Sequence, residues 1–248
     1  MGLTIHYRLQ THLTDPREVH NLVESLRQFA RDLPLKEVSE LLEFTDKDAD
    51  YEQDSRDDEH RWFKIQAAQY VELERSHVSV KPAHIIGFST WPGEGCEPAN
   101  FGFCRYPKSI EVAAAAGRKR RLPTGLEGWR WGSFCKTQYA SDAKLGGTAH
   151  FLRCHLLVVK LLDFIRHTEM IDVAVSDEGG YWEHRDLAKL AQEVGEWNEQ
   201  IAALVGQLND AAHEHGVTSE AAITEFANFE HLEAKGLERL RQRMRETE

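Results

Sequence analysis

Residues 84–106 have the sequence HIIGFSTWPGEGCEPANFGFCRY, in which two aromatic and β-branched segments flank a turn rich in proline and glycine. Segments of this composition favour strands, and a Pro- and Gly-rich connection favours a reversal of the chain between them. Residues 84–91 and 99–106 are therefore predicted to form a β-hairpin.

The segments before this hairpin predict a strand, a helix and a second strand. Residues 3–8 alternate apolar and polar side chains, which is typical of a half-buried strand. Asp15 stands at an N-cap position and Pro16 at the first helical position, and apolar side chains follow at helical spacing as far as Leu33. Residues 37–44 are then expected to form a strand.

The segments after the hairpin predict one more helix and one more strand. Residues 148–168 are expected to be helical, and residues 171–176 alternate apolar with polar or small side chains. The order of elements fits a ferredoxin-like β-α-β-β-β-α-β sandwich with insertions. Residues 1–180 are accordingly predicted to form an α+β sandwich domain.

The last part of the chain, residues 181–248, is predicted to be an antiparallel helical hairpin packed on the same domain. Apolar residues recur there at steps of three and four over three heptads: Leu187, Leu190, Val194, Trp197, Ile201, Leu204 and Leu208. Such a seam forms either where a helix packs on its own sheet or where it pairs with another chain. The sequence leaves both alternatives open.

Negative charge is concentrated in one segment. The chain of 248 residues has 30 Lys and Arg against 41 Asp and Glu, a formal net charge of −11. Residues 45–60 hold eight of the acids and two of the bases, so an exposed acidic loop is expected there. Because nucleic-acid-binding proteins are usually basic, this balance argues against a long nucleic acid as partner.

The apolar content predicts a folded protein without a membrane span. Hydrophobic residues make up 41 % of the chain, yet no apolar run reaches the roughly 18 residues that a transmembrane helix needs. The sequence of residues 1–10, MGLTIHYRLQ, lacks the apolar block of a signal peptide, and the four cysteines include no C-x-x-C pair. A cytoplasmic protein with free thiols is therefore expected.

The segment GWRWGSFCKTQYA, residues 128–140, is dense in aromatic side chains. Cys135 is a candidate catalytic nucleophile, because the neighbouring Lys136 would favour the thiolate and lower the thiol pKa. The aromatic side chains are candidate walls of a ligand pocket: Trp129, Trp131 and Tyr139. Aromatic residues at this density also occur in protein cores, which is the alternative.

The segment SDEGGYWEHRD, residues 176–186, links the last predicted strand to the C-terminal helices. Glu178 and His184 are candidate catalytic residues, since a carboxylate and an imidazole can divide acid and base roles. Asp177, Tyr181 and Trp182 are candidate ligand-binding residues beside them. The alternative is a glycine turn with acidic side chains near a helix N-terminus.

His150 and Cys154 are four residues apart in the helix predicted over residues 148–168, so both project from one face. They are candidate metal ligands if other residues, such as His184 or Asp177, complete the site. The alternative is a hydrogen-bonded core histidine beside an apolar thiol.

Three segments resemble a group of uncharacterised bacterial proteins: PGEGCEPANFGFCRYP, WRWGSFCKTQYA and DEGGYWEHRD. The resemblance spans roughly residues 80–200. It implies a bacterial cytoplasmic protein, but it implies no activity, cofactor or catalytic residue.

These features together predict a small-ligand-binding or catalytic α+β domain, with a pocket of aromatic, histidine and carboxylate side chains. The alternative is a non-enzymatic interaction protein that forms a homo-oligomer through its C-terminal helical hairpin. The sequence specifies neither a cofactor nor a reaction type.

Overall fold

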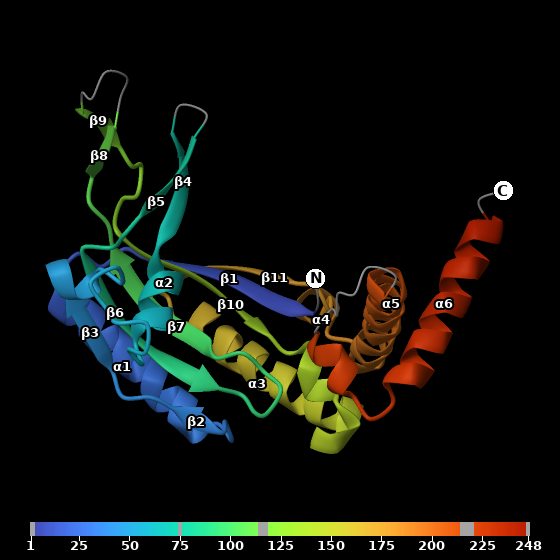
Figure 1. The fold of residues 1–248 in the computed structure, drawn as a ribbon. Helices are drawn as coiled ribbons and strands as arrows, with labels where there is room; N and C mark the ends of the chain where they lie inside the picture. The colour runs from blue at the N-terminus through green and yellow to red at the C-terminus, as the bar shows by residue number, and fades with distance from the viewer. Residues whose placement is uncertain (1–2, 74–75, 114–118, 214–220, 247–248) are drawn as a thin grey trace.

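A computed structural model of the chain describes residues 3–73, 76–113, 119–213 and 221–246 (Figure 1). The strands of the main sheet are β1 (Thr4–Thr11), β2 (Glu37–Val38), β3 (Leu42–Thr45), β6 (His84–Trp91), β7 (Ala99–Arg105), β10 (Trp129–Lys136) and β11 (Ile171–Asp177). Two smaller hairpins consist of β4 (Gln69–Leu73) with β5 (Ser76–Val80), and of β8 (Ser109–Ala113) with β9 (Lys119–Pro123).

The helices are α1 (Pro16–Asp32), α2 (Arg61–Ala67), α3 (Gly147–Arg166), α4 (Tyr181–His184), α5 (Leu187–His213) and α6 (Phe229–Glu246). Short 3-10 helices connect them: η1 (Asp46–Ala49), η3 (Gln138–Ser141), η4 (Ala143–Leu145) and η5 (Ala222–Glu225). Among the described residues, no helix is both long enough and apolar enough to cross a membrane.

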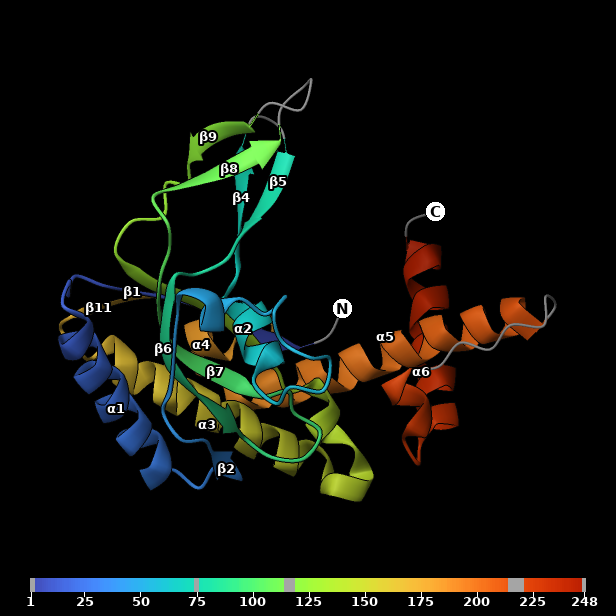
Figure 2. The same cartoon turned by 60° about the vertical axis from the view of Figure 1, so that its left-hand side comes forward.

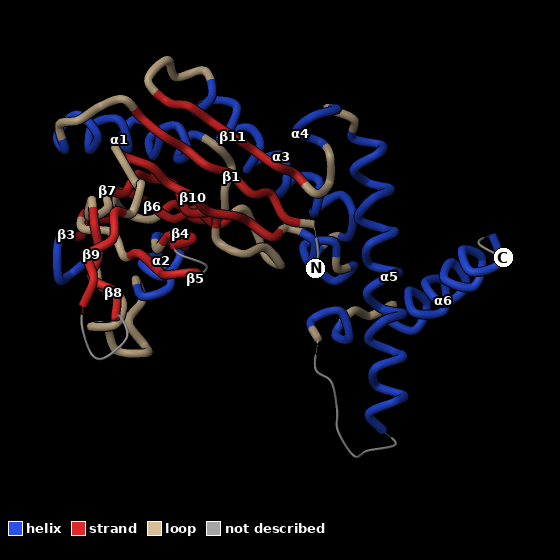
Figure 3. Tube along the Cα trace, turned by 90° about the horizontal axis from the view of Figure 1, so that it is seen from above, coloured by secondary structure: helices blue, strands red, loops and turns tan. Residues whose placement is uncertain are grey.

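The main sheet is antiparallel throughout, with the strand order β11-β1-β10-β7-β6. Both β2 and β3 pair with the outer edge of β6. The first strand of the chain therefore lies inside the sheet, between β10 and β11, as the view from above shows (Figure 3). The last two strands of the sheet in chain order, β10 and β11, thus flank the first strand, β1.

Helices α1 and α3 cover one face of this sheet. The carboxylate of Asp15 accepts a hydrogen bond of 2.9 Å from the backbone N–H of Arg17, so the predicted N-cap of α1 is confirmed. The rings of Phe29 in α1 and Phe164 in α3 stack at 3.8 Å between centroids. The two helices thus form one layer over the sheet.

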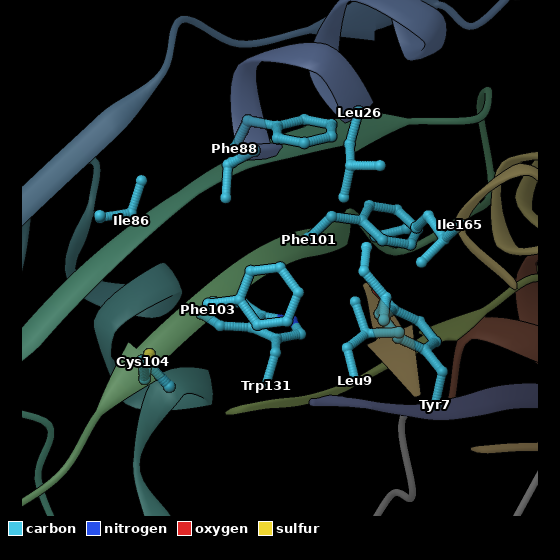
Figure 4. Packing of buried hydrophobic residues seen from close by; sticks show 14 of the residues in the cluster. Tyr7, Leu9, Leu26, Ile86, Phe88, Phe101, Phe103, Cys104, Trp131 and Ile165 are labelled. Carbon is cyan, nitrogen blue, oxygen red and sulfur yellow. The ribbon is translucent and has the colours of Figure 1, made fainter. Parts of the chain in front are cut away.

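The core lies between this helical layer and the sheet. Figure 4 shows Tyr7, Phe88 and Phe101 of three strands gathered with Leu26 of α1 and Ile165 of α3. The rings of Tyr7 and Phe101 stack at 4.9 Å between centroids. Burial of such large aromatic side chains removes much apolar surface from water and so stabilises the fold.

A pair of glycines lies where α2 packs on the opposite face of the sheet. Gly87 of β6 pairs directly with Gly102 of β7. A Cβ atom at Gly87 would lie 2.8 Å from the ring of Phe63 in α2 and 2.6 Å from the carbonyl oxygen of Phe101. The absence of a side chain at Gly87 therefore lets the aromatic ring of Phe63 rest on the sheet, and the absence of one at Gly102 lets β7 lie close to the backbone of β6.

The acidic segment of residues 45–60 lies next to α2 and is fixed by lysines. Lys81 Nζ lies 2.7 Å from a carboxylate oxygen of Asp50, and Lys64 Nζ lies 2.8 Å from a carboxylate oxygen of Asp54. Lys64 is buried, so its charge requires this partner. Part of the predicted exposed loop is thus an ion-paired segment of the fold.

The structure is a mixed α/β fold, and its predicted hairpin, β6 with β7, is confirmed. The ferredoxin-like topology is not confirmed: β10, which lies between β1 and β7, was not among the predicted strands, and β6, β2 and β3 extend the sheet beyond β7. The sequence of β10 was interpreted as a ligand-binding segment, although its alternating burial is that of a half-covered strand. The predicted strand over residues 37–44 is two short strands.

The two C-terminal helices pack together, but α6 crosses α5 rather than running alongside it (Figure 2). The contact point consists of small residues: a Cβ atom at Gly236 would lie 2.7 Å from the Cβ atom of Ala203. Leu190 and Val194 of α5 pack against Phe151 of α3. The first half of α5 thus joins the sheet domain, and its second half carries α6.

We expect Gly102→Ala to destabilise the protein by about 1–3 kcal/mol, because the new Cβ atom would meet the backbone of β6 at Ile86 and Gly87. Gly195→Ala is the matched control, since a Cβ atom at Gly195 meets open space within helix α5. That control should stabilise by about 0.5–1 kcal/mol. Urea unfolding followed by circular dichroism measures both values, and equal values would show that the glycine pair is not a packing constraint.

Candidate functional site

Three polar side chains from separate elements meet at one end of the sheet. His155 of α3 lies with its Nδ1 atom 3.0 Å from the hydroxyl of Thr137, which follows β10. Its Nε2 atom lies 3.1 Å from a carboxylate oxygen of Asp177, the last residue of β11. All three side chains are completely buried or nearly so.

The carboxylate of Asp177 also organises the glycine turn that follows it. It accepts hydrogen bonds from the backbone N–H groups of Gly179 at 2.8 Å and Trp182 at 3.0 Å. Gly180 has a φ of +66°, a conformation that favours glycine. The turn therefore folds back on the carboxylate and starts α4.

The protonation of this cluster follows from the hydrogen bonds. Burial alone would raise the pKa of Asp177, but hydrogen bonds from His155, Trp182 and Gly179 hold that pKa below its usual value. Because an ionised carboxylate only accepts hydrogen bonds, the Nε2 atom of His155 carries a proton. The hydroxyl of Thr137 is the hydrogen-bond partner of the other ring nitrogen of His155, Nδ1.

The hydroxyl, imidazole and carboxylate have the composition of a hydrolase triad. However, the side chains of Thr137 and His155 have no solvent exposure. A substrate would have no path to the hydroxyl oxygen. The cluster therefore acts as a structural connection between α3, β10 and β11.

The structure brings together only some of the candidate residues of segments 128–140 and 176–186. Cys135 and Asp177 both pair with Ile5 of β1, so they lie two strand spacings apart, about 10 Å. Glu178 accepts a hydrogen bond of 2.9 Å from the backbone N–H of Thr4. His184 lies instead on the exposed end of α4.

The prediction of a lowered pKa at Cys135 is wrong. Successive residues of a strand point to opposite faces, so Lys136 does not share the environment of the thiol. Cys135 is completely buried, and its Sγ atom donates to the carbonyl oxygen of Glu97 at 3.2 Å. Burial raises the pKa of this thiol well above its usual value.

The aromatic candidates lie in different places. Trp129 and Trp131 are buried in the core, where the Nε1 atom of Trp131 donates to the carbonyl oxygen of Asn100 at 2.7 Å. Tyr139 packs against Phe226, which lies between η5 and α6. These side chains do not wall a common pocket.

Tyr181 and Trp182 are half-buried in α4, and the guanidinium of Arg185 lies over both rings. Arg185 also makes two hydrogen bonds to the carboxylate of Asp163 in α3, at 2.6 and 2.7 Å. The predicted ligand-stacking residues thus take part in fixing α4 on α3.

His150 and Cys154 share one face of α3, with 3.6 Å between His150 Nε2 and Cys154 Sγ. Among the residues that the structure describes, no group of three or more His, Cys, Asp or Glu side chains is placed to hold a metal ion. Within the described residues, neither Asp177 nor His184 is placed beside this pair as a third metal ligand.

A groove lies on the face of the sheet that α1 and α3 leave open. Two adjoining hollows of about 430 and 520 Å³ share Arg8, Gln69 and Ala174 in their walls. The side chains that point into this groove come from directly opposed positions of three strands: His6, Arg8, Gln10, Arg130, Phe134, Asp172 and Ser176. We call the two hollows together the sheet-face groove.

Gly132 on the floor of the sheet-face groove and Gln69 above it determine the shape of the groove. Gly132 leaves the floor without a side chain, and a Cβ atom there would lie 3.2 Å from the amide of Gln69. Gln69, the first residue of β4, lines both hollows, so β4 forms one wall. Tyr70, the next residue, is 74 % exposed beside Arg130.

The sheet-face groove is not among the predicted sites, although part of its pattern is visible in the sequence. The polar residues His6 and Arg8 alternate with the core residues Ile5 and Tyr7, which identifies them as facing away from the core. The partner strands β10 and β11 could not be assigned to β1 from the sequence alone. The chain matches no protein-family model, no curated protein and no solved structure.

We expect Asp177→Asn to destabilise the protein by about 3 kcal/mol at pH 7, because an amide cannot accept from His155, Gly179 and Trp182 at once. Asp172→Asn is the control on the same strand. The side chain of Asp172 is 71 % exposed, and its substitution should change stability by less than about 0.5 kcal/mol.

The same pair of variants tests the acid dependence. The pKa of Asp177 is lower in the folded protein than in the unfolded chain, where it is about 3.9. Its stabilisation is therefore complete above about pH 5 and is lost as the pH falls through the lowered folded-state value. Urea unfolding from pH 7 to pH 2 should show the difference between wild type and Asp177→Asn shrinking in acid. A difference that stays constant with pH would contradict this assignment.

Proposed function

We propose that the protein binds a small organic anion with a planar apolar part in the sheet-face groove. The observation that supports this proposal is the position of two arginines, Arg8 and Arg130, beside exposed aromatic surface in a hollow of ligand size. Pockets of about 300–1,000 Å³ are typical of small-molecule sites. The proposed role is binding, since the buried hydroxyl, imidazole and carboxylate cluster has no access to a ligand.

The charge distribution favours an anion. Arg8 is exposed on β1, and the guanidinium of Arg130 donates to the carbonyl oxygen of Glu127 at 3.2 and 3.0 Å, which leaves its charge uncompensated by that partner. Asp172 is the acidic residue of the groove, and one of its carboxylate oxygens lies 3.2 Å from the Nε2 atom of His12. Guanidinium groups bind carboxylate or phosphate through paired hydrogen bonds.

The aromatic side chains favour a planar group on the same ligand. Phe134 is half-buried in one hollow, and Tyr70 lies in the wall of the other. Gly132 between them removes a side chain from the middle of the floor. A flat apolar ring fits over such a floor, and the arginines then contact its charged substituent.

The probe for this proposal is 8-anilinonaphthalene-1-sulfonate, which combines a planar apolar part with an anionic group. We expect saturable binding of one equivalent to the wild type, measured by fluorescence titration and calorimetry. The double variant Arg8→Gln with Arg130→Gln should bind the probe with an affinity at least about tenfold lower, because two charged donors are removed. Gly132→Leu should block the groove independently of charge.

Arg56→Gln is the matched control, since Arg56 is exposed and does not line the sheet-face groove. The control should bind the probe as the wild type does. Equal affinities of the wild type, the arginine double variant and Gly132→Leu would reject the groove as the site.

A second candidate function is self-assembly through α5. The predicted seam is buried at Leu190 and Val194, but Leu204 is 43 % exposed and Leu208 is 50 % exposed. The reason is that α6 packs on a different face of α5, around Ala203 and Gly206. The exposed half of the seam therefore resembles a surface that another helix would cover.

Sedimentation velocity tests this second candidate. If the exposed leucines mediate assembly, the wild type is an oligomer at micromolar concentrations, and the double variant Leu204→Glu with Leu208→Glu is a monomer. Leu187→Glu is the control, because Leu187 is equally exposed but lies at the start of α5. A monomeric wild type up to about 100 μM would exclude an assembly of biological strength.

A further inference from the structure

Strand β11 forms one edge of the main sheet, and among the described residues it pairs with β1 alone (Figure 3). Natural proteins usually protect such an edge with a lysine, a proline, a bulge or a covering segment. The sequence of β11, IDVAVSD, contains neither lysine nor proline, and its pairing with β1 continues without a bulge from Ile171 to Asp177. The edge is therefore of the kind that accepts a further strand.

The backbone groups of Val173 and Val175 point toward this edge. The backbone N–H of Glu178 donates to the carbonyl oxygen of Thr4 in β1 at 3.1 Å, so the backbone of Glu178 faces β1. Successive residues of a strand direct their backbone groups to alternate sides. The N–H and C=O groups of Val173 and Val175 therefore face away from β1.

Turns close both ends of the edge. The backbone N–H of Ile171 donates to the carbonyl oxygen of Thr168 at 3.0 Å. The carbonyl oxygen of Asp177 accepts a hydrogen bond of 2.9 Å from the N–H of Gly180. The backbone groups that remain for an added strand are thus those in the middle of β11.

The side chains of β11 leave apolar surface at the same edge. Val173 and Val175 are only half-buried, although both pack against the core. Met170, which directly precedes the strand, is 44 % exposed. An added strand would therefore cover valine side chains as well as pair with the backbone.

The sequence of β11 is complementary to itself about Ala174. In an antiparallel pair of two copies centred on this residue, Val173 faces Val175 of the partner subunit, so the valines form cross-strand pairs and exchange backbone hydrogen bonds. Ala174 faces its own counterpart in a non-hydrogen-bonded pair, where the strands come closest and small side chains fit. Asp172 faces Ser176 of the partner subunit, so no like charges are opposed.

Other registers are less favourable. Centring the pair on Val175 would oppose Asp172 to Glu178 of the partner subunit, and like charges directly opposite each other are destabilising. Centring it on Val173 would leave the last residues of the strand without an opposed residue. The register centred on Ala174 pairs the whole strand.

We propose that two copies of this chain pair along β11, so that their main sheets form one continuous antiparallel sheet. This contact is separate from the exposed leucines of α5 and does not depend on a ligand in the sheet-face groove. Because Asp172, Ala174 and Ser176 line that groove, the two grooves lie side by side across the contact.

Sedimentation velocity of the full chain tests the contact. We expect the wild type to be a dimer at about 100 μM and the double variant Leu204→Glu with Leu208→Glu to remain one. Ala174→Lys and Ala174→Glu should each raise the dimer dissociation constant at least about tenfold, because each opposes two like charges. An equimolar mixture of these two variants should dimerise again, because the mixed pair opposes unlike charges.

Ala174→Ser is the matched control and should dimerise as the wild type does, since it stays small and uncharged. Ala174 is exposed, so these substitutions spare the core, and circular dichroism checks that each variant is folded. A monomeric wild type at about 100 μM overturns the proposal and leaves the edge to a different partner. A dimer that Ala174→Lys leaves intact, or that the leucine double variant abolishes, also overturns it.

A cross-link tests the register. Ala174→Cys should form a disulfide-linked dimer with oxidised glutathione, because the Cβ atoms of a non-hydrogen-bonded pair lie close together. Ser176→Cys is the control, since position 176 faces Asp172 of the partner subunit. The wild type controls for the native cysteines. Cross-linking of Ser176→Cys to the same extent as Ala174→Cys would contradict the register.

Discussion

The hydrogen bond between His155 and Asp177 is the constraint on which the arrangement of the domain depends. It joins the helical layer to the last strand of the sheet inside an interior that water does not reach. A buried carboxylate without its donors would cost several kcal/mol, so α3 cannot rotate or slide without a large penalty. The same carboxylate holds the glycine turn that leads into α4 and α5.

A sheet with helices on one face leaves the other face to solvent or to a ligand. In this protein α2 covers the open face near β6, where Gly87 admits the ring of Phe63. Helix α2 also contacts β10, whereas β11 and β1 stay uncovered, and the side chains that face the groove are mostly polar or charged. The sheet-face groove follows from that incomplete coverage, and Gln69 and Tyr70 of β4 bound it on one side.

Local signals in the sequence were sufficient for the elements but not for their neighbours. Asp15 and Pro16 identified the start of α1, and residues 84–106 identified the hairpin, because both signals depend on adjacent residues. The pairing of β1 with β10 joins distant segments, and no local pattern encodes it. The tryptophans of β10 suggested a pocket for the same reason that they fill a core: large aromatic surfaces stabilise either environment.

Burial, rather than residue type, distinguished the true roles of the candidate residues. Cys135 and Cys154 are both interior thiols, yet of the two only Cys154 has an imidazole, that of His150, beside its sulfur. Its position depends on the neighbouring residue of α3, because His155 is locked to Asp177 and adjacent helical residues point about 100° apart. The hydrogen bond that fixes the rotation of α3 therefore also directs Cys154 toward the turn of residues 92–98, where its Sγ atom lies 3.7 Å from the carbonyl oxygen of Pro92. The core contact of His155 and the contact of Cys154 with this turn are thus two consequences of one helix orientation.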